Sequence, residues 1–205
     1  PAYRNILKAL DIEPVDLLVG PQTNFQPTPD LLDRIDGPLD GLIIASPSNP
    51  TGTMIPAPQL KALAAYCRER KIRLISDEIY HGVTYGERAE TALNFNTDAI
   101  VINSFSKYFS MTGWRLGWLV FPDGLSRSIE CLAQNLFISA PTISQIAAIK
   151  AFDCRDELDA NVARYRVNRD LLMKELPCAG FSKLSHAEGA FYIYADVSDM
   201  TDDSN

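Results

Sequence analysis

The chain has 205 residues, 46% of them hydrophobic, and its 19 basic and 26 acidic side chains give a formal net charge of −7. This length suits one domain, or one domain and part of a second, with enough apolar residues for a sizeable core. The acidic balance and the scattered Lys and Arg residues argue against a nucleic-acid-binding or membrane-binding surface. We therefore expect any phosphate to be bound locally, by a few dedicated side chains.

The four cysteines include no C-x-x-C pair, and together with only two histidines they indicate neither a metal site nor a disulfide framework. They are typical of free thiols in a reducing compartment. No run of about 18 apolar residues and no signal peptide is present, so we expect a cytoplasmic protein. The chain opens at Pro1 and stops at TDDSN, and we also expect it to be a piece of a longer protein.

In chain order, the first predicted elements are a short helix over 1–10 and a buried strand over 15–19. Thr28 and Pro29 are typical of a helix start, and this helix is predicted to reach residue 35. Strands are predicted over 41–45, 72–76, 99–102 and 116–121. The helix between the first two of these strands has one apolar face, formed by Leu60, Leu63, Ala64 and Cys67.

The second half of the chain is predicted to be mostly helical. Helices are expected over 123–137, 142–152 and 156–176, with Pro177 ending the last one. The alternating pattern of 180–197 predicts strands of a second, smaller unit. We therefore expect a large domain over 1–152, a connecting helix over 153–176, and the start of a small α+β domain over 177–205.

Strands that alternate with helices predict an α/β fold, with an open, mostly parallel sheet and helices on both faces. In such sheets ligands bind beyond the carboxyl ends of the strands. Three polar stretches, SPSNPTG (46–52), DEIY (77–80) and NSFSK (103–107), each follow directly on a predicted strand. We expect them to converge on one edge of the sheet.

The stretch NSFSKYFSMTGWRLGW (103–118) combines hydroxyl donors, an amine and a guanidinium. Ser104, Ser106 and Arg115 have the chemistry to donate hydrogen bonds to a phosphate dianion. Lys107 between them is a candidate nucleophile for a Schiff base. This combination suits an aldehyde cofactor that carries a phosphate, whereas S-x-S-K alone is also compatible with a polar turn between two strands.

Together these motifs resemble those of the class I/II aminotransferases, which are pyridoxal 5'-phosphate enzymes of fold type I. SPSNPTG, SDEIY and SFSK occur in the family's order, and an arginine follows the lysine by eight residues. Asn49 lies 28 positions before Asp77, which lies 30 positions before Lys107. Four matches in register are far more specific than any one of them.

The resemblance implies a role for each matched residue. Lys107 would be the catalytic lysine, which forms a Schiff base with the cofactor and then transfers protons. Asp77 would pair with the pyridine nitrogen and keep it protonated. Tyr80 and Asn49 would hydrogen-bond the ring hydroxyl oxygen, and Asn49 would also lie near the substrate carboxylate. Ser104, Ser106 and Arg115 would bind the phosphate.

Structural alternatives remain for several of these residues. Asp77 also suits a helix N-cap, Asn49 is also a typical turn residue before Pro50, and Tyr80 is compatible with an ordinary half-buried tyrosine. His81 invites a general-base role, but Lys107 already serves that purpose under the resemblance, so we expect a packed or surface histidine.

The implied activity is transfer of an amino group between an amino acid and a 2-oxo acid, in a homodimer whose subunits complete each other's pocket. No extra arginine occurs in 132–141, which favours a neutral or aromatic amino donor over aspartate. Two alternatives share the same residues. One is a carbon–sulfur β-lyase of the same fold, and the other is an aminotransferase-like effector domain of a transcription regulator.

Overall fold

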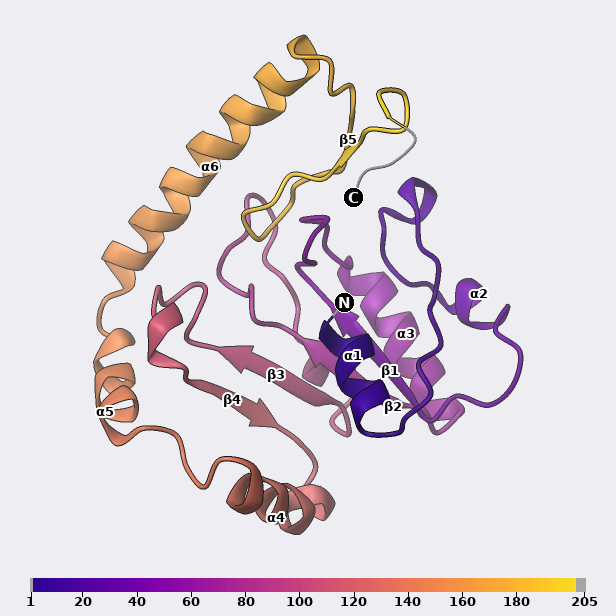
Figure 1. Ribbon diagram of the computed structural model, residues 1–205, viewed down its shortest axis with the longest axis vertical. Helices are drawn as coiled ribbons and strands as arrows, with labels where there is room; N and C mark the ends of the chain where they lie inside the picture. Colours follow the sequence, from indigo (N-terminus) through magenta and orange to yellow (C-terminus); the bar gives the residue numbers. More distant parts are fainter. Residues whose placement is uncertain (1, 202–205) are drawn as a thin grey trace.

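The structure, a computed structural model, describes residues 2–201 and contains a four-stranded sheet that is flanked by helices (Figure 1). The strands lie in the order β1-β2-β3-β4, in which β1 to β3 are parallel and β4 is antiparallel to β3. This arrangement confirms the predicted open, mostly parallel α/β sheet. A two-stranded antiparallel pair, β5-β6, forms a second sheet near the end of the chain.

The elements of the first half alternate between helix and strand. They are α1 (Ala2–Ala9), η1 (Pro21–Thr23), α2 (Pro29–Leu32), β1 (Gly41–Ala45), α3 (Ala57–Glu69), β2 (Arg73–Asp77), η2 (Ala92–Asn94), β3 (Ile100–Ser104), η3 (Thr112–Trp114) and β4 (Gly117–Val120). The second half is mainly helical, as predicted. Its elements are η4 (Asp123–Leu125), α4 (Ser126–Leu136), α5 (Thr142–Ala151), α6 (Arg155–Cys178), β5 (Lys183–Leu184) and β6 (Ala195–Asp196).

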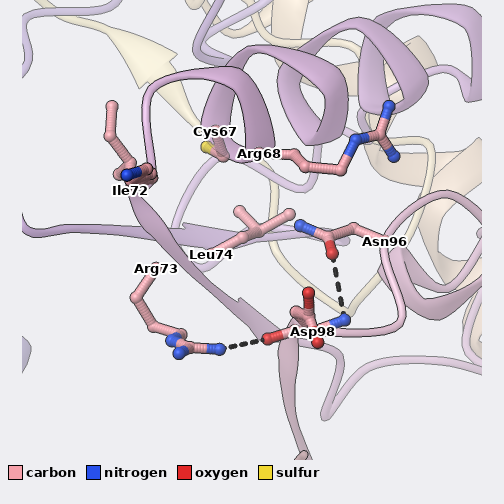
Figure 2. Close-up of a pocket in the computed structure, with 8 residues that line it drawn as sticks. Cys67, Arg68, Ile72, Arg73, Leu74, Asn96 and Asp98 are labelled. Carbon is pink, nitrogen blue, oxygen red and sulfur yellow. Dashed lines mark hydrogen bonds between the residues drawn. The ribbon is translucent and has the colours of Figure 1, made fainter.

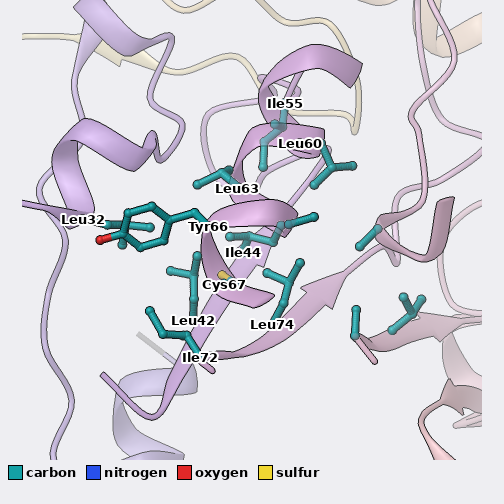
Figure 3. Close-up of a cluster of buried hydrophobic side chains, with 14 residues drawn as sticks. Leu32, Leu42, Ile44, Ile55, Leu60, Leu63, Tyr66, Cys67, Ile72 and Leu74 are labelled. Atoms are coloured by element: carbon teal, nitrogen blue, oxygen red, sulfur yellow. The ribbon is translucent and has the colours of Figure 1, made fainter. Parts of the chain in front are cut away.

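The main core lies between α3 and one face of the sheet (Figure 3). Leu60 and Leu63 of α3 are at most 1% exposed, and they belong to the same buried cluster as Ile44 of β1 and Leu74 of β2. Alternate residues of a strand point to opposite faces. Ile43 and Ile75 therefore lie on the other face, where they are only half-buried. The four apolar positions predicted for α3 are all buried, which confirms its orientation.

A smaller core joins the loop after β3 to α5. Phe105, Met111 and Ala148 are buried there, with Phe109 and Trp118 packed against them. From α5 the chain enters α6, which runs along the outside of the molecule and leads to the β5-β6 segment (Figure 1). That segment returns over the carboxyl ends of the strands, where Thr84 forms an isolated antiparallel bridge with Gly189.

The predicted buried strand over 15–19 is wrong. This segment has no regular structure and Leu18 is 86% exposed. β propensity reflects packing on a paired, half-buried surface, and this segment has no neighbouring strand among the described residues. Asp16 instead forms an exposed ion pair with Arg4 of α1 (2.8 Å).

Two helix ends also differ from the predictions. Thr28 does cap α2, since its side chain accepts a hydrogen bond from Leu31 N, but the α-helix ends at Leu32 instead of residue 35. Pro177 does not terminate α6, which continues to Cys178. A proline in the last turn removes only one backbone hydrogen bond, so the helix tolerates it there.

The strands predicted within 180–197 are present but short, with two residues each. Among residues 2–201, no helix is both long enough and apolar enough to cross a membrane.

Candidate active site

The carboxyl ends of β1, β2 and β3 bring the predicted residues to one edge of the sheet. Ala45 pairs with Asp77, and Asp77 pairs with Ile102, so β1 and β2 end at the same level and β3 extends two residues further, to Ser104. The turn after β1, the segment after β2 and the loop after β3 therefore leave the sheet side by side. This is the edge at which open α/β sheets bind their ligands.

Asp77 is the last residue of β2, and it is only 8% exposed. Its Oδ1 accepts a hydrogen bond from Ile79 N (3.2 Å), and its Oδ2 accepts one from the hydroxyl of Tyr3. No helix begins at Asp77, because residues 79–82 form turns, so the alternative that Asp77 is a helix N-cap is wrong. A buried carboxylate requires donors or a cation to offset its desolvation, and this one has donors from two segments.

Tyr3 was not predicted from the sequence. It lies on α1, 74 positions before Asp77, and the burial of its ring together with the Asp77 contact raises its pKa. The hydroxyl is therefore neutral near pH 7 and donates its proton to the carboxylate. A tyrosine in a short helix forms no sequence motif, and the contact depends entirely on how α1 packs.

Tyr80 lies almost fully buried beside Lys107. The Lys107 Nζ atom is 5.2 Å from the centre of the Tyr80 ring and 5.4 Å from that of Phe191, distances that suit cation–π contacts. The Tyr80 hydroxyl lies 2.7 Å from the hydroxyl of Tyr192. Phe191 and Tyr192 were also missed, because their alternating stretch predicted only a strand. Asp77, Tyr80 and Lys107 thus gather as the motifs indicated.

Ser104 is the last residue of β3 and organises the loop that follows. Its Oγ donates to the carbonyl of Leu116 (3.2 Å) and accepts from Ser106 N (3.0 Å). Arg115 has a left-handed backbone (φ 52°), and its exposed side chain donates to the Thr112 carbonyl (3.1 Å). The loop therefore brings these side chains to one end of the β3–β4 pair. Phosphate binding would require the Ser104 hydroxyl to turn away from Leu116.

Asn49 is exposed in the turn after β1, between the cis bonds Ser46–Pro47 and Asn49–Pro50. The turn is closed by hydrogen bonds from Gly52 N to Ser48 O (2.8 Å) and from Ser48 N to Thr53 O (2.9 Å). The turn predicted at Asn49-Pro50 is confirmed. The start of this turn lies next to Asp77, because Ser46 N donates a hydrogen bond to Asp77 O (3.1 Å).

His81 is packed, as expected for a histidine without a catalytic role. Its Nδ1 lies 3.4 Å from a carboxylate oxygen of Glu78. Burial lowers the pKa of His81, and the negative charge of Glu78 only partly opposes this effect. Glu78 is itself held by Thr91 Oγ1 (3.1 Å) and Ala92 N (2.8 Å). Glu78 therefore connects the segment after β2 to Thr91 and to the start of η2.

A separate hollow of about 230 Å³ opens beside Arg73 and Leu74, at the amino end of β2 (Figure 2). Asp77 is at the opposite end of this strand. It is lined by Cys67, Arg68, Lys71, Ile72, Arg73, Leu74, Asn96 and Asp98. Arg73 Nη1 donates to the carbonyl of Asp98 (2.7 Å) and Arg68 Nη1 to that of Phe95 (3.4 Å). Both guanidinium groups thus hold backbone carbonyls, and none of the predicted site residues lines this hollow.

Comparisons with known proteins identify the family. The family model described as aminotransferase class I and II matches residues 1–204, so the chain belongs to this family. The resemblance seen in the motifs is therefore confirmed. Members of this family depend on pyridoxal 5'-phosphate, which also confirms the predicted cofactor.

Three relatives illustrate the similarity. Valine–pyruvate aminotransferase from Mycobacterium tuberculosis is 51% identical over 208 residues, which cover 100% of this chain and 54% of the relative. An aminotransferase structure from Mycobacterium tuberculosis superposes with a TM-score of 0.96 at 51% identity, covering 99% of this chain and 54% of that one. Aspartate aminotransferase from Thermus thermophilus with maleate has a TM-score of 0.91 at 29% identity, covering 98% and 54%. The chain thus spans about half the length of these relatives.

The residues at the sheet edge fit the cofactor chemically. A buried carboxylate at Asp77 suits a protonated pyridine nitrogen, because opposite charges stabilise each other in a low-dielectric site. The Tyr80 hydroxyl suits the ring oxygen, and Lys107 supplies the amine beside it. Ser104, Ser106 and Arg115 offer hydroxyl and guanidinium donors for a phosphate.

Proposed function

We propose that the full-length protein is a pyridoxal-phosphate-dependent aminotransferase that moves an amino group between an amino acid and a 2-oxo acid. The observation that carries this proposal is the convergence of Asp77, Tyr80 and Lys107 at the carboxyl ends of β2 and β3. Membership of the aminotransferase family and the names of the relatives support it and favour transamination over the β-lyase and regulator alternatives.

Each residue has a defined task in this proposal. When bound, the cofactor supplies an electron sink that stabilises negative charge at the substrate Cα. Lys107 would hold the cofactor through its amine and would transfer a proton at the substrate Cα, as base and then as acid. Asp77 keeps a proton on the ring nitrogen, and Tyr80 and Asn49 donate to the ring oxygen. Ser104, Ser106 and Arg115 bind the phosphate.

We further propose the domain division of the chain, with residues 1–152 in the large cofactor-binding domain, 153–176 in the connecting helix and 177–205 in the small domain. The course of α6 along the outside of the molecule supports this division (Figure 1).

A homodimer is proposed because α4 and α5 expose a row of large apolar side chains. Ile143, Ile146 and Ile149 of α5 are 70%, 62% and 68% exposed, and Leu136 of α4 is 75% exposed. Patches of this kind mark interaction surfaces. A cytoplasmic location is supported by the four cysteines, which are all free.

The amino donor is proposed to be neutral or aromatic. No arginine lies in residues 132–141, which suits a substrate without a second carboxylate. The relative named valine–pyruvate aminotransferase supports a neutral donor, whereas others named aspartate aminotransferase do not. Comparing valine, phenylalanine and aspartate as donors for the full-length enzyme tests this point.

The direct test of the proposed function is borohydride reduction of the full-length protein with pyridoxal phosphate, followed by peptide mass spectrometry. We expect one pyridoxyl adduct, on Lys107, and amino-group transfer to a 2-oxo acid. Release of ammonia, pyruvate and a thiol from a cysteine conjugate would instead identify a β-lyase. An adduct on Lys61, Lys71 or Lys150 would disprove the lysine assignment.

A further inference from the structure

Tyr80 and Tyr192 share a hydrogen bond in the interior of the site. Their hydroxyl oxygens are 2.7 Å apart and their rings meet edge to face, with centroids at 5.8 Å and an interplanar angle of 75°. Tyr80 is 2% exposed and Tyr192 is half-buried. The two residues lie 112 positions apart, so the contact joins the segment after β2 to the C-terminal stretch.

The backbone next to Tyr192 is fixed to the site by several hydrogen bonds. Glu188 N and Gly189 N both donate to Gly52 O (2.9 Å each), and Ala190 N donates to Val83 O (2.9 Å). Gly52 has φ +68°, and a Cβ at this position would lie 2.9 Å from the carbonyl oxygen of Tyr192. The turn after β1 and the segment before Tyr192 therefore approach each other so closely that position 52 requires glycine. This close approach holds Tyr192 against Tyr80.

The number of available protons sets the direction of this hydrogen bond. Burial is the main cause that raises the pKa of Tyr80, and the hydrogen bond to Tyr192 is the second, so the Tyr80 hydroxyl keeps its single proton near neutral pH. A phenol has one proton to donate. If Tyr80 donates that proton to the cofactor ring oxygen, its own oxygen accepts, and Tyr192 becomes the donor.

We propose that Tyr192 is a positioning residue that donates a hydrogen bond to the Tyr80 oxygen and thereby orients Tyr80 as a donor to the cofactor ring oxygen. This inference rests on the proposed function, because it requires the cofactor beside Tyr80. Chains of hydrogen bonds strengthen one another, so Tyr192 also makes Tyr80 a better donor.

Two charged residues near Tyr80, Asp77 and Lys107, already have roles in the proposed function. Asp77 acts on Tyr80 through its negative charge, and the Lys107 amine lies 5.2 Å from the ring centre. Tyr192, in contrast to Asp77 and Lys107, shares a hydrogen bond with the Tyr80 hydroxyl. Removing the Tyr192 hydroxyl therefore alters the Tyr80 donor without changing any charge in the site.

The test is a pH titration of the visible absorption of the cofactor bound to the full-length enzyme. A donor to the ring oxygen stabilises the deprotonated chromophore and lowers its pH midpoint. We expect Tyr80→Phe to raise the midpoint and Tyr192→Phe to raise it in the same direction, by roughly 10–30% of that shift. The double variant should match Tyr80→Phe, because Tyr192 acts only through Tyr80.

A matched control is Tyr66→Phe, which removes a hydroxyl that donates to Asp33 Oδ1 (2.8 Å) far from the site. It should leave the midpoint at the wild-type value. A measurement without cofactor complements the titration. In the cofactor-free full-length protein, the effects of Tyr80→Phe and Tyr192→Phe on the unfolding midpoint should be non-additive, since both remove the same hydrogen bond.

Several results would overturn this inference. If Tyr192→Phe has the wild-type pH midpoint while the midpoint of Tyr80→Phe is shifted, Tyr192 does not orient Tyr80. This result would leave the proposed function intact. Shifts that simply add in the double variant would show that Tyr192 acts independently of Tyr80, which would overturn the positioning role and leave the proposed function intact. A wild-type enzyme without any visible cofactor band would overturn both the inference and the proposed function.

Discussion

The hydroxyl of Tyr3 donates a hydrogen bond to Oδ2 of Asp77, and this contact connects α1 to the end of β2. Asp77 also accepts from Ile79 N, so both carboxylate oxygens are engaged within the protein. In the proposed enzyme the ring nitrogen of the cofactor would join these donors. Tyr3 would then hold the carboxylate in a fixed orientation.

We therefore expect Tyr3→Phe in the full-length enzyme to lower kcat/KM roughly tenfold to hundredfold. A hydrogen bond to a charged group contributes about 1.5–3 kcal/mol, and here its loss leaves Ile79 N as the remaining described donor to the carboxylate, which is then held less firmly. Steady-state kinetics measures the effect, with Tyr66→Phe as the control that loses a remote Tyr–Asp contact. Wild-type kinetics in Tyr3→Phe would show that the contact has no part in catalysis.

Asp77→Asn should preserve the fold and cofactor binding but slow transamination by about 10²–10³. The amide keeps the volume and loses the negative charge, and such a charge-assisted contact in a buried site contributes on the order of 2–4 kcal/mol to the transition state. Single-turnover kinetics and cofactor titration separate the two properties. A near-native rate would contradict the assignment of Asp77 to the ring nitrogen.

Lys107→Arg should abolish both turnover and the borohydride-trapped adduct. Arginine keeps the positive charge next to the rings of Tyr80 and Phe191, but its guanidinium stays protonated and is no nucleophile. The same change at the exposed Lys150 serves as the control and should leave both properties unchanged. Residual turnover above about 1% of wild type would mean that another amine carries the chemistry.

The thiol of Cys67 should be protected from alkylation in the folded protein. It is fully buried in α3, and burial raises its pKa to about 11. Mass spectrometry after brief iodoacetamide treatment should detect modified Cys154 and Cys178, which are exposed, and unmodified Cys67. Rapid alkylation of Cys67 would show that α3 opens readily.

The same burial predicts a pH dependence of stability. The unfolded thiol has a pKa near 8.5, so its contribution is complete below about pH 8 and is lost as the pH rises toward 11. Denaturant unfolding at pH 7.5 and 10 should therefore show a smaller loss of unfolding free energy in Cys67→Ala than in wild type. Equal losses in both proteins would assign the alkaline destabilisation to other groups.

The 205-residue chain expressed by itself should be inactive and should self-associate. Ile143, Ile146 and Ile149 are exposed on α5, and β4, the last strand of the sheet within residues 2–201, exposes Leu119 (46%) and Val120 (40%). Unpaired apolar strand edges and apolar patches promote association. Light scattering of the fragment and of the full-length protein measures the difference. A stable, active monomer of the fragment would refute this prediction.

The sequence by itself determined the class of fold and the identity of the motifs. Apolar runs of strand length alternate with an amphipathic helix, which predicts the α/β fold. SPSNPTG, DEIY and SFSK follow these strands, and the carboxyl ends of parallel strands form the ligand-binding edge of such a sheet. The apolar face of α3 was predictable for a similar reason, since helical spacing alone selects Leu60, Leu63, Ala64 and Cys67.

Only the tertiary structure decided which side chains support those motifs. Tyr3 reaches Asp77 across 74 positions and Tyr192 reaches Tyr80 across 112, and neither residue has a local pattern that marks it. The segment 15–19 has strand-like composition but no strand beside it, so it stays irregular. Periodicity encodes which face of an element is buried, whereas contacts between distant segments depend on how those segments pack, and local sequence does not record this.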